Sequence, residues 1–130
     1  MNLHPQLEKD SLLLGDLELS QLRIIPDGEL TWFLLIPRKD DLIDWDDLSL
    51  EDQKILCEEI SFVSLKMKEF KSPDKINVAS LGNMVSQLHI HVIARYKSDR
   101  AWPKPVWGTT SEVSFKSEEV QFWQNLLGLN

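Results

Sequence analysis

The chain has 130 residues, of which 42% are hydrophobic and 27% are charged, and its formal net charge at pH 7 is -7. This length and composition fit one soluble domain around a single core, which we place over residues 1–130. The acidic balance argues against broad binding to nucleic acids or anionic membranes, but it leaves room for a small nucleotide in a local pocket.

The first elements expected along the chain are a short helix and a β-hairpin. Residues 4–11 can form the helix, with a proline near its first position. The leucine run 12–14 follows, and residues 16–25 alternate loosely between apolar and polar, as a strand does. After a Pro-Asp-Gly turn, the dense apolar run 30–36 predicts the second strand of the hairpin, central and buried in its sheet.

A long helix, two further strands and a terminal helix are expected in the rest of the chain. Residues 49–70 predict the long helix, because a serine N-cap precedes an acidic residue by three positions and apolar residues recur at helical spacing. Residues 75–80 and 87–95 read as strands joined by a Gly-Asn turn. Residues 97–111 look irregular, and residues 117–127 predict the terminal helix.

The most informative segment is the strand at 87–95, which carries two of the three histidines. Side chains alternate along a strand, so Gln87, His89 and His91 are expected on one face, with apolar residues between them facing a core. A row of polar side chains is costly to bury without partners, so it usually lines a site.

The residues alone leave three explanations for this row. The histidines form a hydrogen-bonded structural pair, or they bind zinc, or they act on a phosphate. For zinc, the only other strong ligands are His4 and Cys57, and their spacing does not indicate convergence. For a phosphate, a neutral imidazole can act as nucleophile, a second can donate to oxygens, and the nearby Gly-Asn turn can add donors.

Three blocks of the sequence make the chain resemble the histidine triad (HIT) superfamily. Residues 87–93 match the motif His-φ-His-φ-His-φ-φ, where φ is apolar, with glutamine at the first position. Residues 32–38 resemble the family's apolar strand that ends in Ile-Pro-Lys/Arg, and residues 101–108 resemble its Trp-Pro loop. The resemblance covers about residues 15–108 and leaves residues 109–130 as a C-terminal extension.

The resemblance implies an α+β fold in which an antiparallel sheet of about five strands packs against one long helix, and we add the C-terminal helix. It implies a homodimer that binds a nucleotide or dinucleotide substrate, without a cofactor or metal. The implied activity is nucleotide hydrolysis or nucleotidyl transfer at the α-phosphate, as in diadenosine polyphosphate hydrolases. A nucleotide-binding regulatory protein with little turnover is the alternative.

The resemblance also assigns roles to the residues of the motif. His89 matches the histidine that attacks the α-phosphate, and His91 matches the one that bonds the phosphate or orients the nucleophile. Gln87 cannot act as an acid, but its amide can still donate a hydrogen bond.

Residues outside the motif receive supporting roles from the same resemblance. Asn77 and Asn83 match positions that contact phosphate or support the site, and Gly82 belongs to the same turn. Trp102 matches a tryptophan that contacts the substrate or the neighbouring subunit. For Trp32, core packing is favoured over a place in the wall of the base pocket.

Where many HIT members hold the ribose with an aspartate near the hairpin, the closest acidic residue in this chain is Asp27. The base preference and the exact substrate stay open at this point.

The single cysteine, Cys57, cannot form an intrachain disulfide, which is compatible with a reducing compartment. The first residues lack the basic and apolar regions of a secretory signal, and no apolar run is long enough to be a transmembrane helix. We therefore expect a cytoplasmic protein.

Overall fold

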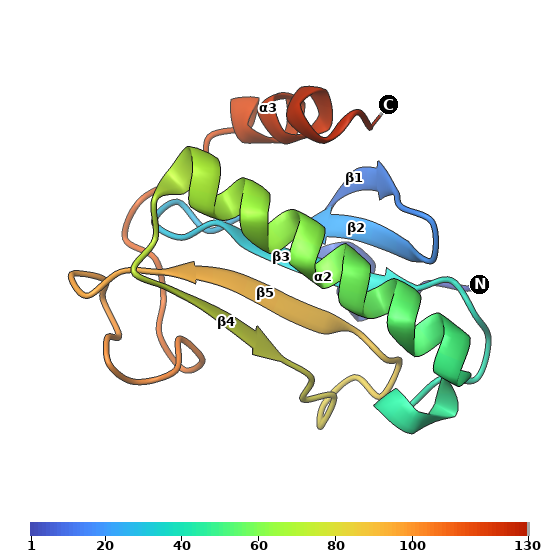
Figure 1. Ribbon diagram of the computed structural model, residues 1–130. Helices are drawn as coiled ribbons and strands as arrows, with labels where there is room; N and C mark the ends of the chain where they lie inside the picture. Colours follow the sequence, from blue (N-terminus) through green and yellow to red (C-terminus); the bar gives the residue numbers. More distant parts are fainter. Residues whose placement is uncertain (130) are drawn as a thin grey trace.

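A computed structural model, which describes residues 1–129, contains a five-stranded antiparallel sheet with the strand order β1-β2-β3-β5-β4 (Figure 1). The predicted α+β class, the long helix and the C-terminal helix are confirmed. The elements are α1 (Pro5–Asp10), β1 (Leu12–Asp16), β2 (Ser20–Ile24), β3 (Trp32–Pro37), a 3-10 turn (Trp45–Asp47), α2 (Leu50–Lys71), β4 (Lys75–Ala79), β5 (Ile90–Arg95) and α3 (Glu118–Leu127).

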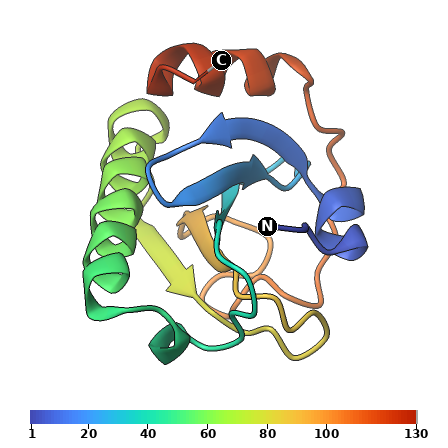
Figure 2. The same ribbon diagram turned by 90° about the vertical axis from the view of Figure 1, so that its right-hand side faces the viewer.

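One face of the sheet forms the main core. Strand alternation places Phe33 of β3 and Val92 of β5 opposite each other on this face, where α2 and α3 cover them (Figure 2). The indole of Trp123 from α3 packs edge-on against the ring of Phe33, with 4.9 Å between ring centroids. Helix α2 begins at a serine N-cap, as predicted, because the Ser49 side chain accepts from the Asp52 amide.

The opposite face of the sheet carries the histidines. Leu34 of β3 pairs with His91 of β5, so both side chains point away from α2. This face is covered in part by α1, whose Leu7 packs on Leu34, and in part by the 97–111 segment, whose Val106 is buried beside the sheet. The site therefore lies between the sheet on one side and the short helix α1 and the 97–111 segment on the other.

The strand predicted over residues 16–25 is shorter in the structure and begins at Ser20. β1 takes the leucine run and ends at Asp16, a turn follows, and β2 starts at Ser20. The reason is Glu59, a buried carboxylate on α2 whose Oε2 accepts from the Leu19 amide at 2.8 Å and the Ser20 amide at 3.3 Å. This contact from α2 holds a tight turn that local periodicity does not reveal.

The two edges of the sheet differ. Along the edge strand β1, the Gln124 side chain of α3 donates to the Leu14 carbonyl at 3.2 Å. Gly15 has φ +153°, and a Cβ there would lie 2.9 Å from Cβ of Leu129, so the chain after α3 approaches β1 closely. β4 forms the other edge, and within residues 1–129 no helix or strand lies beyond it (Figure 1). No helix in this part of the chain is long and apolar enough to cross a membrane.

Candidate active site at the histidine pair

His89 and His91 line one pocket of about 630 Å³ on the sheet face away from α2. Its walls come from α1, the β2–β3 connection, β3, the 81–85 loop and Trp107. The predicted alternation is confirmed, because the apolar residues between and beside the histidines belong to the main core. Both imidazoles are only 7% exposed, and their ring centroids lie 5.0 Å apart.

The environment of His89 determines which ring nitrogen is free. Its Nδ1 lies 2.7 Å from the main-chain carbonyl oxygen of Gln87. A carbonyl can only accept, so Nδ1 carries the proton in this bond and Nε2 keeps its lone pair. No hydrogen bond within residues 1–129 occupies Nε2 of His89. His89 therefore has both the tautomer and the free nitrogen that a nucleophile requires.

His91 has the opposite arrangement. The indole Nε1 of Trp32 donates to His91 Nδ1 at 2.9 Å. Burial, and secondarily the neighbouring His89, lower the pKa of His91 from 6.5 to about 4. His91 is therefore neutral at pH 7.

Two tryptophans enclose His91. The ring of Trp107 meets it edge-on with centroids 5.0 Å apart, and meets Trp32 in the same way at 5.6 Å. Sequence reasoning favoured core packing for Trp32, which is buried and also lines the pocket. Trp102 lies elsewhere, with the Arg95 guanidinium 5.7 Å from its ring, and it does not line the pocket.

The residues assigned to phosphate binding are divided between two places. Gly82 and Asn83 line the pocket, in a loop where Gly82 has φ +70°, a conformation that favours glycine. Asn77 lies on β4 outside the pocket lining, and its Oδ1 accepts from Nη1 of Arg95 at 2.9 Å.

The side chain of Gln87 leaves the polar row and contacts the N-terminal residues instead. Its Oε1 accepts from the His4 amide at 2.7 Å, and its Nε2 donates to the Asn2 carbonyl at 3.2 Å. Gln87 does not line the pocket, and it contributes to the site through its main-chain carbonyl, which orients His89.

The two remaining zinc candidates lie apart from the pair. His4 Nδ1 accepts from the Gln6 amide at the start of α1, and Cys57 is exposed on α2. Residues 1–129 contain no group of three or more histidine, cysteine or acidic side chains arranged to hold a metal ion.

A buried ion pair that sequence reasoning missed organises the loop leading to Trp107. Arg95 is 1% exposed, and its Nε and Nη2 donate to the two oxygens of Asp99 at 2.7 and 3.0 Å. Asp99 also accepts from three backbone amides of residues 96–102. The bond from Arg95, together with these amides and against the opposing effect of burial, holds the pKa of Asp99 well below its usual range.

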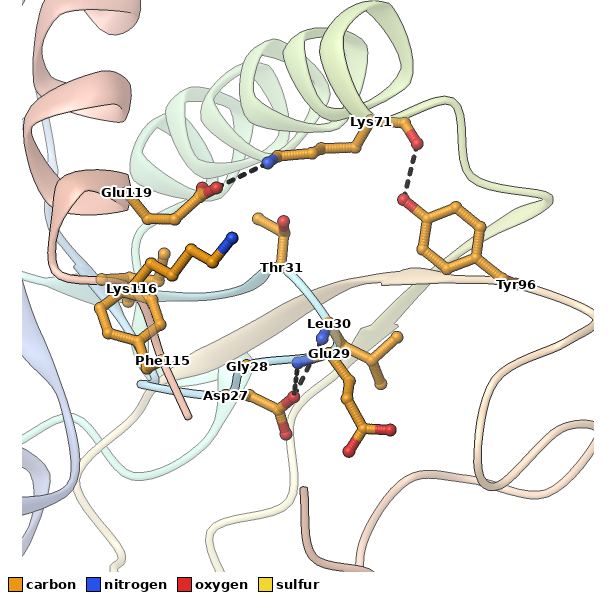
Figure 3. A pocket seen from close by; sticks show the side chains of 11 residues that line it. Asp27, Gly28, Glu29, Leu30, Thr31, Lys71, Tyr96, Phe115, Lys116 and Glu119 are labelled. Atoms are coloured by element: carbon orange, nitrogen blue, oxygen red, sulfur yellow. Dashed lines mark hydrogen bonds and ion pairs between the residues drawn. The ribbon is translucent and has the colours of Figure 1, made fainter. Parts of the chain in front are cut away.

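Figure 3 shows a second cavity, of about 200 Å³. It shares no lining residue with the histidine pocket. Its charged groups are largely paired, with Lys71 bonded to Glu119 at 2.8 Å and Asp27 to Arg100 at 2.6 Å. Asp27, the acidic candidate for a ribose contact, therefore faces this second cavity. Among the described lining residues of the histidine pocket, the single carboxylate is Asp10.

Comparisons with known proteins agree with this geometry. The family model described as HIT domain matches residues 6–98. A histidine triad protein of Bradyrhizobium japonicum is 43% identical, with a TM-score of 0.90, over 98% of this chain and 95% of that one. Histidine triad proteins of Sinorhizobium meliloti (36% identity, TM-score 0.89, 95% and 92% covered) and Marinobacter aquaeolei (39%, 0.89, 97% and 92%) are similar as well. No curated protein matches the sequence significantly.

Proposed function

The chain belongs to the HIT family, and on that premise we propose that it is a nucleotide hydrolase acting at an α-phosphate through a nucleotidyl-histidine intermediate. The observation that carries the proposal is the hydrogen bond from His89 Nδ1 to the Gln87 carbonyl. It leaves the lone pair of Nε2 free in a pocket that can hold a substrate.

In the first step, Nε2 of His89 attacks the α-phosphorus and forms a P–N bond. The bond from phosphorus to the leaving group breaks, and the leaving oxygen or nitrogen departs with the electron pair and takes a proton. In the second step, water attacks the same phosphorus, the P–N bond breaks, and the nucleoside monophosphate is released. Covalent catalysis thus divides one difficult displacement into two.

Charge on the phosphoryl oxygens in both steps needs preorganised donors. Neutral His91, whose Nδ1 is occupied by Trp32, presents Nε2–H as a donor. The amide of Asn83 and the backbone of Gly82 are the further donors in the pocket wall. Phosphate contact by Asn77 stays a prediction, as does substrate or dimer contact by Trp102.

The apolar part of the pocket suits a nucleotide base. Ile25, Pro26 and Leu7 line the side provided by α1 and the β2–β3 connection. Apolar walls discriminate weakly between similar rings, so dinucleoside polyphosphates and nucleoside phosphoramidates are both candidate substrates, diadenosine polyphosphates first among them. The mechanism calls for no cofactor, and a cytoplasmic location stays a prediction.

We also propose a homodimer. β4 is an uncovered edge strand, and Val78 on it is 50% exposed. On helix α2, which precedes β4 in the chain, Phe62 is 38% and Leu65 is 64% exposed. An uncovered strand edge and exposed apolar side chains are both typical of an interface between copies, and light scattering on the purified protein tests for a dimer.

The second candidate function is a nucleotide-binding regulator with little turnover. One observation favours it. The first position of the motif holds Gln87, which cannot titrate, and its side chain bonds to the N-terminal residues. Such a protein would bind nucleotides without forming an adduct.

The test is intact-protein mass spectrometry together with product release, using diadenosine tetraphosphate and an adenosine phosphoramidate. We expect turnover, and an adenylyl adduct that His89→Ala abolishes. His4→Ala is the matched control, because it removes a histidine outside the pocket. Nucleotide binding with neither adduct nor turnover would establish the regulator instead.

A further inference from the structure

We infer that Trp32 is a positioning residue, which holds His91 as the neutral tautomer with its proton on Nε2. The inference rests on the proposed function for its catalytic consequence, but its structural content concerns only the two side chains. It separates Trp32 from the other apolar residues of β3, which pack without a polar role.

The argument begins with the chemistry of the hydrogen bond. An indole Nε1–H is a donor and has no acceptor lone pair. Because it lies 2.9 Å from His91 Nδ1, that nitrogen must present its lone pair. A neutral imidazole has one proton, so the proton of His91 is on Nε2.

Protonation of His91 to imidazolium would place an N–H on Nδ1, directly against the indole N–H. The cation would lose the hydrogen bond and gain a donor–donor repulsion, in addition to the cost of burying a charge. The titratable groups that face this region are His89 and, at the pocket wall, Asp10. The depressed pKa of His91 agrees with the geometry but does not establish it.

Two neighbouring groups thus hold the two histidines in opposite tautomers. The Gln87 carbonyl accepts a hydrogen bond from His89 Nδ1–H, and the Trp32 indole donates a hydrogen bond to His91 Nδ1. One ring is left with a nucleophilic nitrogen and the other with a donor. If His91 took the other tautomer, its lone pair would face the phosphoryl oxygens and repel them.

Imidazole nitrogen NMR tests this directly in the wild-type protein and in Trp32→Phe, which keeps an aromatic ring but removes the donor. In the wild type we expect the Nε2–H tautomer of His91 and a scalar coupling across the indole N–H···N bond. In Trp32→Phe we expect both tautomers of His91, and a pKa raised by about one unit or more. The wild-type coupling needs no variant, so it decides the matter even if the variant fails to fold.

Trp107→Phe is the matched control, because Trp107 also contacts the His91 ring without donating to it. An unchanged tautomer and pKa in Trp32→Phe would overturn the inference. So would an equal shift in Trp107→Phe, since the cause would then be ring packing and not the N–H.

Turnover provides the second readout. We expect Trp32→Phe to lower kcat at pH 7 about fivefold, with little change in KM, because the lost bond orients a donor to the transition state. Wild-type protein that shows the expected tautomer without turnover would refute the proposed hydrolase and leave the role of Trp32 supported. Turnover with an unperturbed His91 in the variant would refute the role of Trp32 alone.

Discussion

The buried, neutral state of His91 makes the stability of the protein depend on pH in a defined direction. The folded pKa of about 4 lies below the value of about 6.5 for an unfolded histidine. The unfolded chain therefore binds the proton first as the pH falls, and each such proton favours unfolding. The contribution of His91 to stability is complete above about pH 6.5 and is lost progressively toward pH 4.

The magnitude follows from the two pKa values. A shift of about 2.5 units corresponds to about 3.4 kcal/mol once the pH lies below both values. Between pH 7 and pH 5 the expected loss from His91 alone is about 2 kcal/mol. Ordinary domains have a free energy of unfolding of roughly 5–15 kcal/mol, so this loss is a large fraction of it.

The assay is urea unfolding at pH 7 and pH 5, for the wild type and for His91→Asn, which cannot titrate. Titratable groups that do not contact His91 contribute equally to both proteins, so the difference between the two free energies of unfolding reports on His91 and its contact with His89. We expect the wild type to lose about 2 kcal/mol more than the variant on acidification. The same difference at both pH values would show that His91 titrates normally in the folded state, and would refute the reasoning.

Three further predictions concern other side chains. Asp99→Asn leaves the Arg95 charge without its partner and should cost about 3–5 kcal/mol in urea unfolding, whereas Lys66→Ala, at an exposed pair, should cost less than about 1 kcal/mol. Glu59→Ala should cost about 2–4 kcal/mol by leaving two buried amides unpaired, and Glu59→Gln should recover most of that loss in the same experiment. Trp107→Ala should raise KM about tenfold in steady-state kinetics by removing an aromatic wall, and an unchanged KM would place the base elsewhere.

Local pattern was sufficient for the parts of the fold that depend on one element at a time. The alternation around His89 and His91 predicts their shared face, and the serine before α2 predicts where that helix begins. Both follow from the period of a single strand or from a single cap, and the structure confirms both. The resemblance to the HIT superfamily implied the antiparallel sheet of about five strands packed against one long helix.

What could not be predicted depends on contacts between distant residues. Gln87 was expected on the face of the histidines, yet it precedes β5. Its side-chain amide bonds to His4 and Asn2, which lie 83 and 85 positions earlier in the chain, and no local pattern reveals this. Trp32 stands in an apolar run beside Phe33, and only the pairing of β3 with β5 decides that the indole faces the histidines while Phe33 faces the core. Arg95 and Asp99 read as ordinary surface charges until the loop folds over them.

The unequal edges of the sheet have a consequence for self-association. At an exposed strand edge, a strand of a second copy can pair with the sheet. If both edges of the sheet are open, further copies can keep adding at either edge. Here α3 and Leu129 lie against β1, so this edge has less room for a further strand. In the homodimer proposed above, association through β4 about a two-fold axis would use the open edges of both copies and would leave only the β1 edges outside. By covering the β1 edge, the C-terminal segment would thus favour a closed dimer over the growth of fibres.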